Sequence, residues 1–508
     1  MNMHNLIFKF SDYTVYSIAQ LQSIVTDYRD STTANEASDS KNAEERYFDI
    51  LCKFVKNIRD ENIIKSKIEG FDYESEADDR ELEYSGLGSI ISSSVMDINL
   101  TTGRVYTKKY IGVLEGIVKL DDITEYDVRI EIGSRFDDDS YQFLNYLISS
   151  SFFKGFNVYD KFTSRSVGGY RIESWLLVIA FKYQLEKAYK NGLFKEYRRF
   201  EYDDSKPHGS IDIVRHIKKN IPFNWKISYN REELTYNNEI MHLVLKAYET
   251  LKKRFPEPTF FLISKSSKAF EAICSIKEVI PNYKDANVQT IISKSYKKID
   301  HPYYGNYEPL RKTCLMILKN AGISLFDESS TKITGVVMNI SKLWEIFLYN
   351  AVLKCIGKDE KEMFNITCQY KIDLSVTDGK KELMSSALRP DFVIEHEGKK
   401  YVLDAKYKAS WEHFVNNPDT GIEVVLTDYR QVTNYVYLIG AKWGGVIFPY
   451  RKNSTRNERC FFVHKQNEHF CVLGLEVPQC CDNDWIESFQ TNLKELQETI
   501  KLQIKRKM

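Results

Sequence analysis

The stretch RPDFVIEHEGKKYVLDAKYK, residues 389–408, consists of two apolar runs joined by the turn-forming sequence EHEGK. Gly398 in that turn can adopt a positive φ, which favours a tight connection between antiparallel strands. Asp404 and Lys406 are two positions apart in the second run, so a strand projects both side chains from the same face. A tight hairpin also brings Asp391, at the Pro-Asp step of the first run, beside them.

These side chains predict a particular chemistry. Two carboxylates and the backbone carbonyl of Ala405 form an all-oxygen set suited to Mg²⁺, with Mn²⁺ as a substitute. A lysine here can orient a water molecule and help to deprotonate it, or stabilise charge on phosphorus oxygens. The set predicts metal-assisted, in-line hydrolysis of a phosphodiester, with Asp391, Asp404 and Lys406 as catalytic residues. The spacing is that of the PD-(D/E)xK nuclease signature.

Three more residues are candidates for the same site. Glu345 lies in LWEIFLYNAVL, which is apolar nearly all round and therefore predicts a buried helix. Its carboxylate should meet the metal or, alternatively, a salt-bridge partner. Gln431 and Tyr435 are four positions apart on a predicted helix and share a face, either in the site or in ordinary helix packing. The pair resembles the Q-x-x-x-Y element that follows the catalytic lysine in RecB-like nucleases.

The C-terminal third, residues 326–508, predicts an α-β-β-β-α-β order, that of a restriction-endonuclease-like PD-(D/E)xK domain. The expected elements are a helix over 343–355, strands at KIDLSV, RPDFVIE and KYVLDAKYK, a helix over 424–439 and a strand at WGGVIFPY. A hairpin and a helix over 485–508 follow. In the hairpin, Cys460, His464, His469 and Cys471 would share one face, which is either structural or a metal site.

The upstream sequence predicts two further domains in an α+β multidomain chain. Residues 1–140 form a β-rich domain, with strand-like alternation over 1–26 and 94–136 and an amphipathic helix over 43–58. Residues 141–325 form a mostly helical module, with helices over 141–153, 173–191 and 237–255. The acidic stretch FDYESEADDRELE is either a solvated, mobile segment or a partner-docking tail.

Charge excludes binding to nucleic acid by bulk attraction, because the 508 residues contain 71 basic and 71 acidic side chains. A local basic stretch with interleaved aromatic residues lies over 193–220 and is either a phosphate-binding or a solvated basic face. The candidate DNA-binding residues are Lys195, Arg198, Arg199, Arg215 and Lys408. No apolar stretch approaches the length of a membrane span, and the N-terminus lacks signal-peptide features, so a cytoplasmic protein is expected.

Several blocks of the sequence resemble the McrC family, the nuclease subunit of prokaryotic McrBC-type restriction systems. They are MNISKLWEIFLYNAVL, LDAKYK and TDYRQVTNYVYLIGAKWGGVIFPY, with weaker similarity in RIEIGSRFDDDSYQFLNYLIS and GLFKEYRRFEYDDSKPHGSIDIVRHI. The similarity covers approximately residues 95–450. The resemblance implies a Mg²⁺-dependent endonuclease that acts on double-stranded DNA in antiviral defence.

The resemblance also implies a partner, a McrB-like hexameric AAA+ GTPase or ATPase onto which the N-terminal region docks. The chain contains no G-x-x-x-x-G-K-[ST] phosphate loop, so nucleotide hydrolysis is expected from that partner. Two alternatives are a self-sufficient, sequence-specific restriction endonuclease and a non-catalytic activator of an AAA+ motor. An intact set of two aspartates and a lysine argues against the last.

Overall fold

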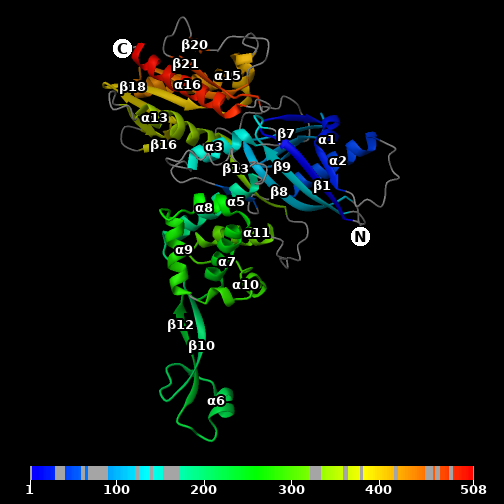
Figure 1. Ribbon diagram of the computed structural model, residues 1–508, viewed down its shortest axis with the longest axis vertical. Helices are drawn as coiled ribbons and strands as arrows, with labels where there is room; N and C mark the ends of the chain where they lie inside the picture. The colour runs from blue at the N-terminus through cyan, green and yellow to red at the C-terminus, as the bar shows by residue number, and fades with distance from the viewer. Residues whose placement is uncertain are drawn as a thin grey trace. The chain divides into compact units, whose positions relative to one another are not determined.

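A computed structural model describes residues 3–28, 40–58, 63–66, 90–120, 125–137, 141–152, 172–280, 282–320, 333–357, 364–377, 382–416, 422–451, 461–463, 470–479 and 484–506. The chain divides into two compact units (Figure 1). Met1–Leu176 and Ser330–Met508 together form the first, here called the composite unit. Leu177–Ser329 forms the second, the helical unit. This division differs from the three consecutive domains 1–140, 141–325 and 326–508 that the sequence predicts.

A six-stranded sheet explains the difference, because it joins strands from both ends of the chain. Its order is β3–β1–β9–β8–β13–β4. The strands span Val25–Tyr28, Met3–Ser11, Glu125–Gly133, Tyr110–Lys119, Thr334–Asn339 and Ile63–Ser66, respectively. β13 pairs antiparallel with β8 and parallel with β4. The C-terminal segment thus supplies a strand to the N-terminal sheet.

The N-terminal region is built on alternating apolar side chains. Phe8, Val128 and Ile130 are fully buried and pack in one core with Phe54 of α2 (Ser40–Lys56), the helix expected over 43–58. A four-stranded sheet, in the order β2–β7–β6–β5, contributes side chains to the same core. Its strands span Val15–Ser17, Arg104–Thr107, Met96–Asn99 and Ile90–Ser92. The strands expected over 94–136 are confirmed, whereas Ile18–Ile24, inside the strand-like stretch 1–26, forms helix α1.

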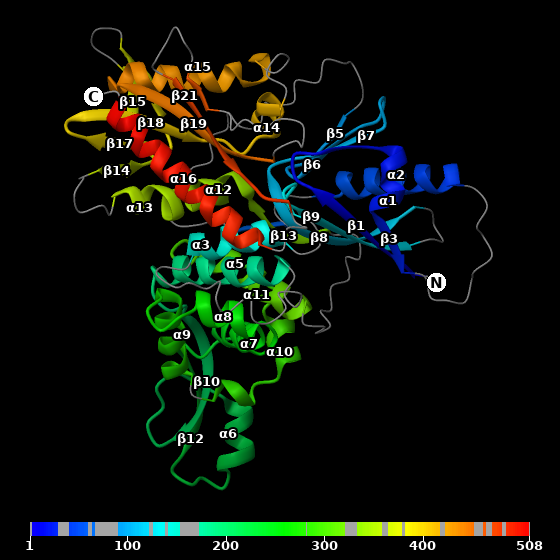
Figure 2. The same cartoon turned by 45° about the horizontal axis from the view of Figure 1, so that its top comes forward.

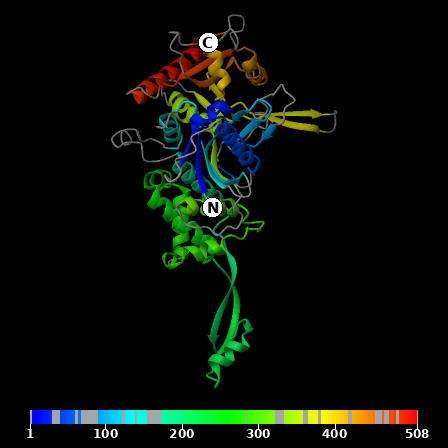
Figure 3. The same cartoon turned by 90° about the vertical axis from the view of Figure 1, so that its right-hand side faces the viewer.

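The helical unit contains a helix bundle and a long β-hairpin. The bundle helices are α7 (Glu239–Arg254), α8 (Pro256–Leu262), α9 (Lys268–Val279), α10 (Val288–Lys294) and α11 (Tyr307–Asn320). Strands β10 (Glu196–Asp204) and β12 (Ile227–Thr235) pair antiparallel and project away from this bundle (Figure 3). Their far end carries β11 (Ser210–Ile211) and α6 (Ile213–Asn220).

The helices expected over 141–153 and 173–191 are confirmed. α3 (Gln142–Phe152) belongs to the composite unit, and α5 (Ile172–Tyr189) passes from one unit into the other. The chain leaves α5 through Gly192, whose φ of 77° is the left-handed conformation that ends many helices.

Among the described helices, none is both long and apolar enough to cross a membrane.

The second large sheet of the composite unit has the order β14–β17–β18–β19–β21–β20. The strands span Asn365–Cys368, Phe392–His396, Lys399–Ala405, Trp443–Tyr450, Phe470–Glu476 and Phe461–Val463. Helices α14 (Ala409–Asn416) and α15 (Ile422–Ile439) cover one face, and α12 (Ile340–Phe347) and α16 (Trp485–Arg506) lie on the other (Figure 2). α12 continues through the π-helical turn η4 (Leu348–Leu353) into α13 (Lys354–Gly357).

The strand expected at KIDLSV is confirmed, but it does not join this sheet. KIDLSV forms β15 (Ile372–Thr377), which pairs only with β16 (Glu382–Leu388) in a separate two-stranded sheet. The first strand is instead β14, which pairs antiparallel with β17. β15 and β16 are neighbours in the sequence and form backbone hydrogen bonds with each other as a hairpin, so they pair without joining the larger sheet. The order helix, three strands, helix, strand is kept with β14 in the first strand position.

Candidate active site

Asp391 and Asp404 converge at one end of the second sheet. β17 and β18 are antiparallel, with Phe392 opposite Leu403, so the residues just outside that pair come to lie side by side. The Asp391 carboxylate accepts a hydrogen bond from the backbone N–H of Ala405 at 2.8 Å. Asp404 is buried in β18, with 3% of its surface exposed. The hairpin thus produces the juxtaposition that the sequence predicts.

Lys406 reaches the same place from the segment that follows β18. Its Nζ lies 2.8 Å from Asp404 Oδ2 and donates to Gln431 Oε1 at 2.9 Å. The Gln431 amide in turn donates to the Tyr435 hydroxyl at 2.9 Å. Gln431 and Tyr435 share the inner face of α15, as their spacing predicts, and together they orient the lysine.

Glu345 enters from α12 and is buried, as the apolar sequence around it predicts. Lys342, one turn earlier, pairs with it at 2.8 Å, so the salt bridge considered above is present. The side-chain amide of Gln369 donates to Glu345 and also to Asp391 Oδ1, the latter at 3.2 Å. Gln369 therefore links the helix carboxylate to the sheet carboxylate, a role that the sequence did not indicate.

Burial, reinforced by repulsion between neighbouring charges, raises the pKa of two carboxylates in this cluster, Asp391 and Glu345. Burial raises the pKa of Asp391 well above its ordinary value, and the charges of Glu345 and Asp404 raise it further. Burial also raises the pKa of Glu345, although Lys342 and Gln369 oppose the shift. A bound cation would relieve this repulsion, because it lowers the energy of every neighbouring carboxylate.

The donor set fits a hard divalent cation, since it consists of oxygen ligands. Within the described ranges, however, no three His, Cys, Asp or Glu side chains form a ready metal site. The Gln369 amide lies between Glu345 and Asp391, and the Lys406 ammonium lies beside Asp404. Asp391, Asp404, Glu345 and the Ala405 carbonyl would hold the metal after these nitrogen donors shift.

Asp428 is a site residue that the sequence reasoning missed. From α15 it pairs with Lys406 at 3.3 Å and Lys408 at 3.1 Å, and it accepts from Trp411 Nε1 at 2.8 Å. Burial raises its pKa, but the two lysines outweigh that effect, so the pKa lies below the ordinary value. Asp428 lies three positions before Gln431 on the same helix face, and this spacing is the signal that would have found it.

The predicted DNA-binding residues do not form a single set. Lys408, in the composite unit, is engaged with Asp428. Lys195, Arg198, Arg199 and Arg215 belong to the helical unit, where Arg198 pairs with Glu239. Arg215 donates to the carbonyls of Tyr202 and Tyr229 and thereby holds the far end of the hairpin together. Lys195 packs over an aromatic ring, and Arg199 is exposed on β10.

Exposed apolar side chains cluster where the hairpin of the helical unit ends. This set, here called the tip patch, belongs to β11, α6 and the turn that follows. Its members are Ile211, Ile213, Val214, Ile217, Ile221, Phe223 and Trp225. Trp225, with 79% of its surface exposed, is the most accessible of them. Large exposed apolar patches mark interaction surfaces in soluble proteins.

Two expectations fall on residues outside the described ranges. They concern the acidic stretch 71–83 and three members of the hairpin set, Cys460, His464 and His469. The fourth member, Cys471, is buried in β21.

Fold and site together define a mixed α+β protein with a buried centre in which carboxylates surround Lys406. Residues 105–449 match the family described as "McrBC 5-methylcytosine restriction system component", and the chain belongs to this family. The family resemblance stated from the sequence is thereby confirmed. No curated protein sequence matches the chain.

Two solved structures from Thermococcus gammatolerans are similar to the chain. One is a half-complex from a tetradecameric assembly of McrB AAA+ hexamers with bound McrC. It is 12% identical, with a TM-score of 0.41, and the match covers 97% of this chain and 100% of that chain. The other is the McrBC complex, 13% identical, with a TM-score of 0.25 and coverage of 70% and 89%.

Proposed function

We propose that this chain is the Mg²⁺-dependent endonuclease subunit of a McrBC-like restriction system, which cleaves double-stranded DNA when an AAA+ NTPase partner activates it. The observation that carries the proposal is the convergence of Asp391, Asp404, Glu345 and Lys406 at one sheet end. Burial raises the pKa of Asp391 and of Glu345, and the charge of the neighbouring Asp404 raises both further. Buried carboxylates with raised pKa values are typical of functional sites.

The topology around the cluster supports a restriction-endonuclease-like core. An antiparallel pair, β17 and β18, is followed by α15 and by β19, which joins β18 in parallel. α12 precedes the strands and brings Glu345 to the same end. Asp404 and Glu345 come from a strand and a helix, and Asp391 and Lys406 directly flank strands β17 and β18, so the site is held by regular elements, as fixed geometry requires.

Each residue has a chemical role in this proposal. Asp391, Asp404, Glu345 and the Ala405 carbonyl bind Mg²⁺, which when bound neutralises developing charge on the phosphate and activates water. Lys406 orients the attacking water or stabilises charge on the phosphorus oxygens. Gln431 and Asp428 hold the Lys406 ammonium in place, and Tyr435 fixes the Gln431 amide.

DNA binding and partner docking use other surfaces. Lys195 and Arg199 remain candidates for phosphate contacts, whereas Arg215 and Lys408 are engaged within the protein. The tip patch supports a protein partner, because exposed aromatic and aliphatic side chains are the usual centre of such interfaces. We propose the tip patch as one contact surface for the McrB-like hexamer and residues 1–140 as another.

The test is a Lys406→Ala variant of the full chain, assayed on plasmid DNA with Mg²⁺, nucleotide and the AAA+ partner. Cleavage should be abolished while the circular dichroism spectrum and partner binding are retained. Lys494→Ala, at an exposed position of α16, is the matched control and should cleave normally. Cleavage by Lys406→Ala would overturn the assignment. Cleavage by the wild-type chain alone would favour a self-sufficient endonuclease, and none with the partner would favour a non-catalytic activator.

A further inference from the structure

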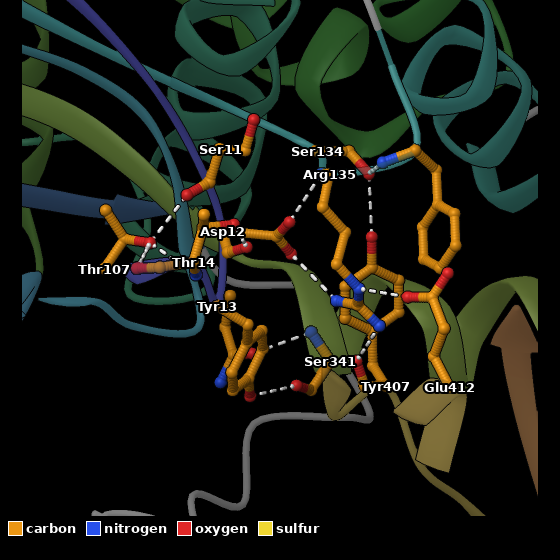
Figure 4. A network of polar contacts seen from close by, with 12 residues as sticks. Ser11, Asp12, Tyr13, Thr14, Thr107, Ser134, Arg135, Ser341, Tyr407 and Glu412 are labelled. Atoms are coloured by element: carbon orange, nitrogen blue, oxygen red, sulfur yellow. Dashed lines mark hydrogen bonds and ion pairs between the residues drawn. The ribbon is translucent and has the colours of Figure 1, made fainter. Parts of the chain in front are cut away.

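A buried polar network in the same unit contacts Tyr407, the residue that follows Lys406 of the candidate active site. It begins where β1 and β9 end, because these strands are parallel with Ser11 opposite Gly133. Asp12 and Arg135, just beyond these strand ends, therefore meet at one end of the sheet (Figure 4). Asp12 accepts from the backbone N–H of Arg135 at 2.7 Å and lies 3.6 Å from its guanidinium. Asp12 has no exposed surface.

The other side of the Arg135 guanidinium holds the segment that follows Lys406. Nη2 donates to the backbone carbonyl of Tyr407 at 2.7 Å, and Nε donates to Glu412 at 3.2 Å. The guanidinium also lies 4.5 Å from the centre of the Tyr407 ring. The Tyr407 hydroxyl lies 2.8 Å from Ser134 Oγ, so the tyrosine is held at its carbonyl, its ring and its hydroxyl.

These contacts require an arginine rather than any cation. One guanidinium faces two carboxylates, Asp12 and Glu412, and still has a donor for the Tyr407 carbonyl. The planar, five-donor fork of arginine can do this, whereas a lysine ammonium is a single point with three donors. Glu412 is fixed from its other side by the backbone N–H of Arg451 at 3.0 Å.

We propose that Arg135 is a positioning residue for Lys406. It fixes the backbone from which Lys406 reaches Asp404 and Gln431, and it thereby couples the N-terminal sheet to the candidate active site. Tyr407 directly follows Lys406, and the Lys406 N–H donates to the Ile447 carbonyl at 2.9 Å, so the segment is held on both sides. If the Arg135 contacts are lost, the hydrogen bond from the Lys406 N–H to the Ile447 carbonyl is left to hold this backbone.

The test measures the accessibility of Lys406 rather than activity. Arg135→Lys and Arg135→Met variants of the full chain are treated with a lysine-acylating reagent, and mass spectrometry follows the modification of Lys406 relative to Lys494. Loss of a hydrogen bond from a charged donor should raise the Lys406 rate by about tenfold or more. The matched control is the same pair of substitutions at Arg311, a buried arginine that binds Glu308 and the Ser295 carbonyl in the helical unit.

An unchanged Lys406 rate in folded Arg135→Lys would overturn the proposal. An equal rise of the Lys406 acylation rate in the Arg311 variants would also overturn the proposal, because a general loss of rigidity would then explain the effect. If the Arg135 variants do not fold, Glu412→Gln decides in their place, because it keeps volume and removes one charge that holds Arg135. Only the effect on cleavage rests on the proposed function: kcat should fall while KM for DNA stays the same. Failure of that function would leave the acylation result intact.

Discussion

Lys406 lies 3.3 Å from Asp428 on helix α15, a carboxylate outside the sequence motif that contains the lysine. Lys406 therefore has buried counter-charges both on strand β18, from Asp404, and on the covering helix. This relationship means that the helix takes part in the electrostatics of the site. It also explains why Lys408 is engaged within the protein rather than presented to a ligand.

Asp428→Ala should destabilise the protein strongly. The substitution leaves Lys406 and Lys408 short of a buried counter-charge, which costs about 3–5 kcal/mol of unfolding free energy. Urea denaturation at pH 7 measures the change. The control is Asp373→Ala, because Asp373 pairs with Lys371 on the surface, where such a pair contributes at most about 1 kcal/mol. Equal losses in the two variants would contradict this assignment.

Asp12 should make stability depend on pH in the acid range. Burial raises its pKa from 3.8 to about 6, although Arg135 opposes the shift. The folded protein then binds the Asp12 proton more tightly than the unfolded chain, so stability falls as pH rises from about 4 to about 6. The unfolding free energy of wild type minus that of Asp12→Asn should fall by about 2–3 kcal/mol between pH 4 and pH 7. A difference independent of pH would contradict the raised pKa.

Gln369→Ala should alter the response to Mg²⁺. The substitution removes the amide donor between Glu345 and Asp391, which costs about 1–3 kcal/mol without metal. Added Mg²⁺ should then raise the melting temperature of the variant more than that of the wild type, since the cation relieves the same repulsion. Gln497→Ala, on helix α16, removes a side-chain donor to the Ala351 carbonyl of η4, which takes no part in the carboxylate cluster, and should not change the Mg²⁺ response. Identical Mg²⁺ shifts in all three proteins would refute the prediction.

Trp225→Ser should weaken partner binding without lowering stability. The side chain is largely exposed, so its removal changes little in the folded chain. An aromatic residue central to an interface contributes about 2 kcal/mol or more, which corresponds to a roughly 30-fold loss of affinity. Binding to the AAA+ partner with a non-hydrolysable nucleotide measures it. Phe260→Ser, at another exposed aromatic position, is the control, and unchanged affinity of Trp225→Ser would exclude the tip patch.

The sequence predicted those parts of the site that depend on local geometry. Asp391, Asp404 and Lys406 lie within one hairpin, so strand alternation and a glycine turn suffice to place them together. The common face of Gln431 and Tyr435 follows from helical spacing in the same way. These inferences need no knowledge of how distant segments pack.

The parts that the sequence did not predict depend on distant pairing or on irregular backbone. β13 pairs with β8, more than 200 residues earlier, and no periodicity in either strand specifies its partner. Gln369 lies in a turn with a φ of 52°, unusual for a residue with a side chain, and its role depends on helix α12 being close. Arg135 likewise acquires its partners only when β1, β9 and the end of β18 meet.

The insertion of β13 into the first sheet has a consequence for how the gene can be divided. The polypeptide leaves the composite unit within α5 and returns to it before β13, so the helical unit is a cassette inside a discontinuous domain. A break at residue 326 would give an N-terminal fragment whose sheet lacks a strand between β8 and β4. Excision of 177–329 with a short joining peptide is the deletion that leaves both sheets whole.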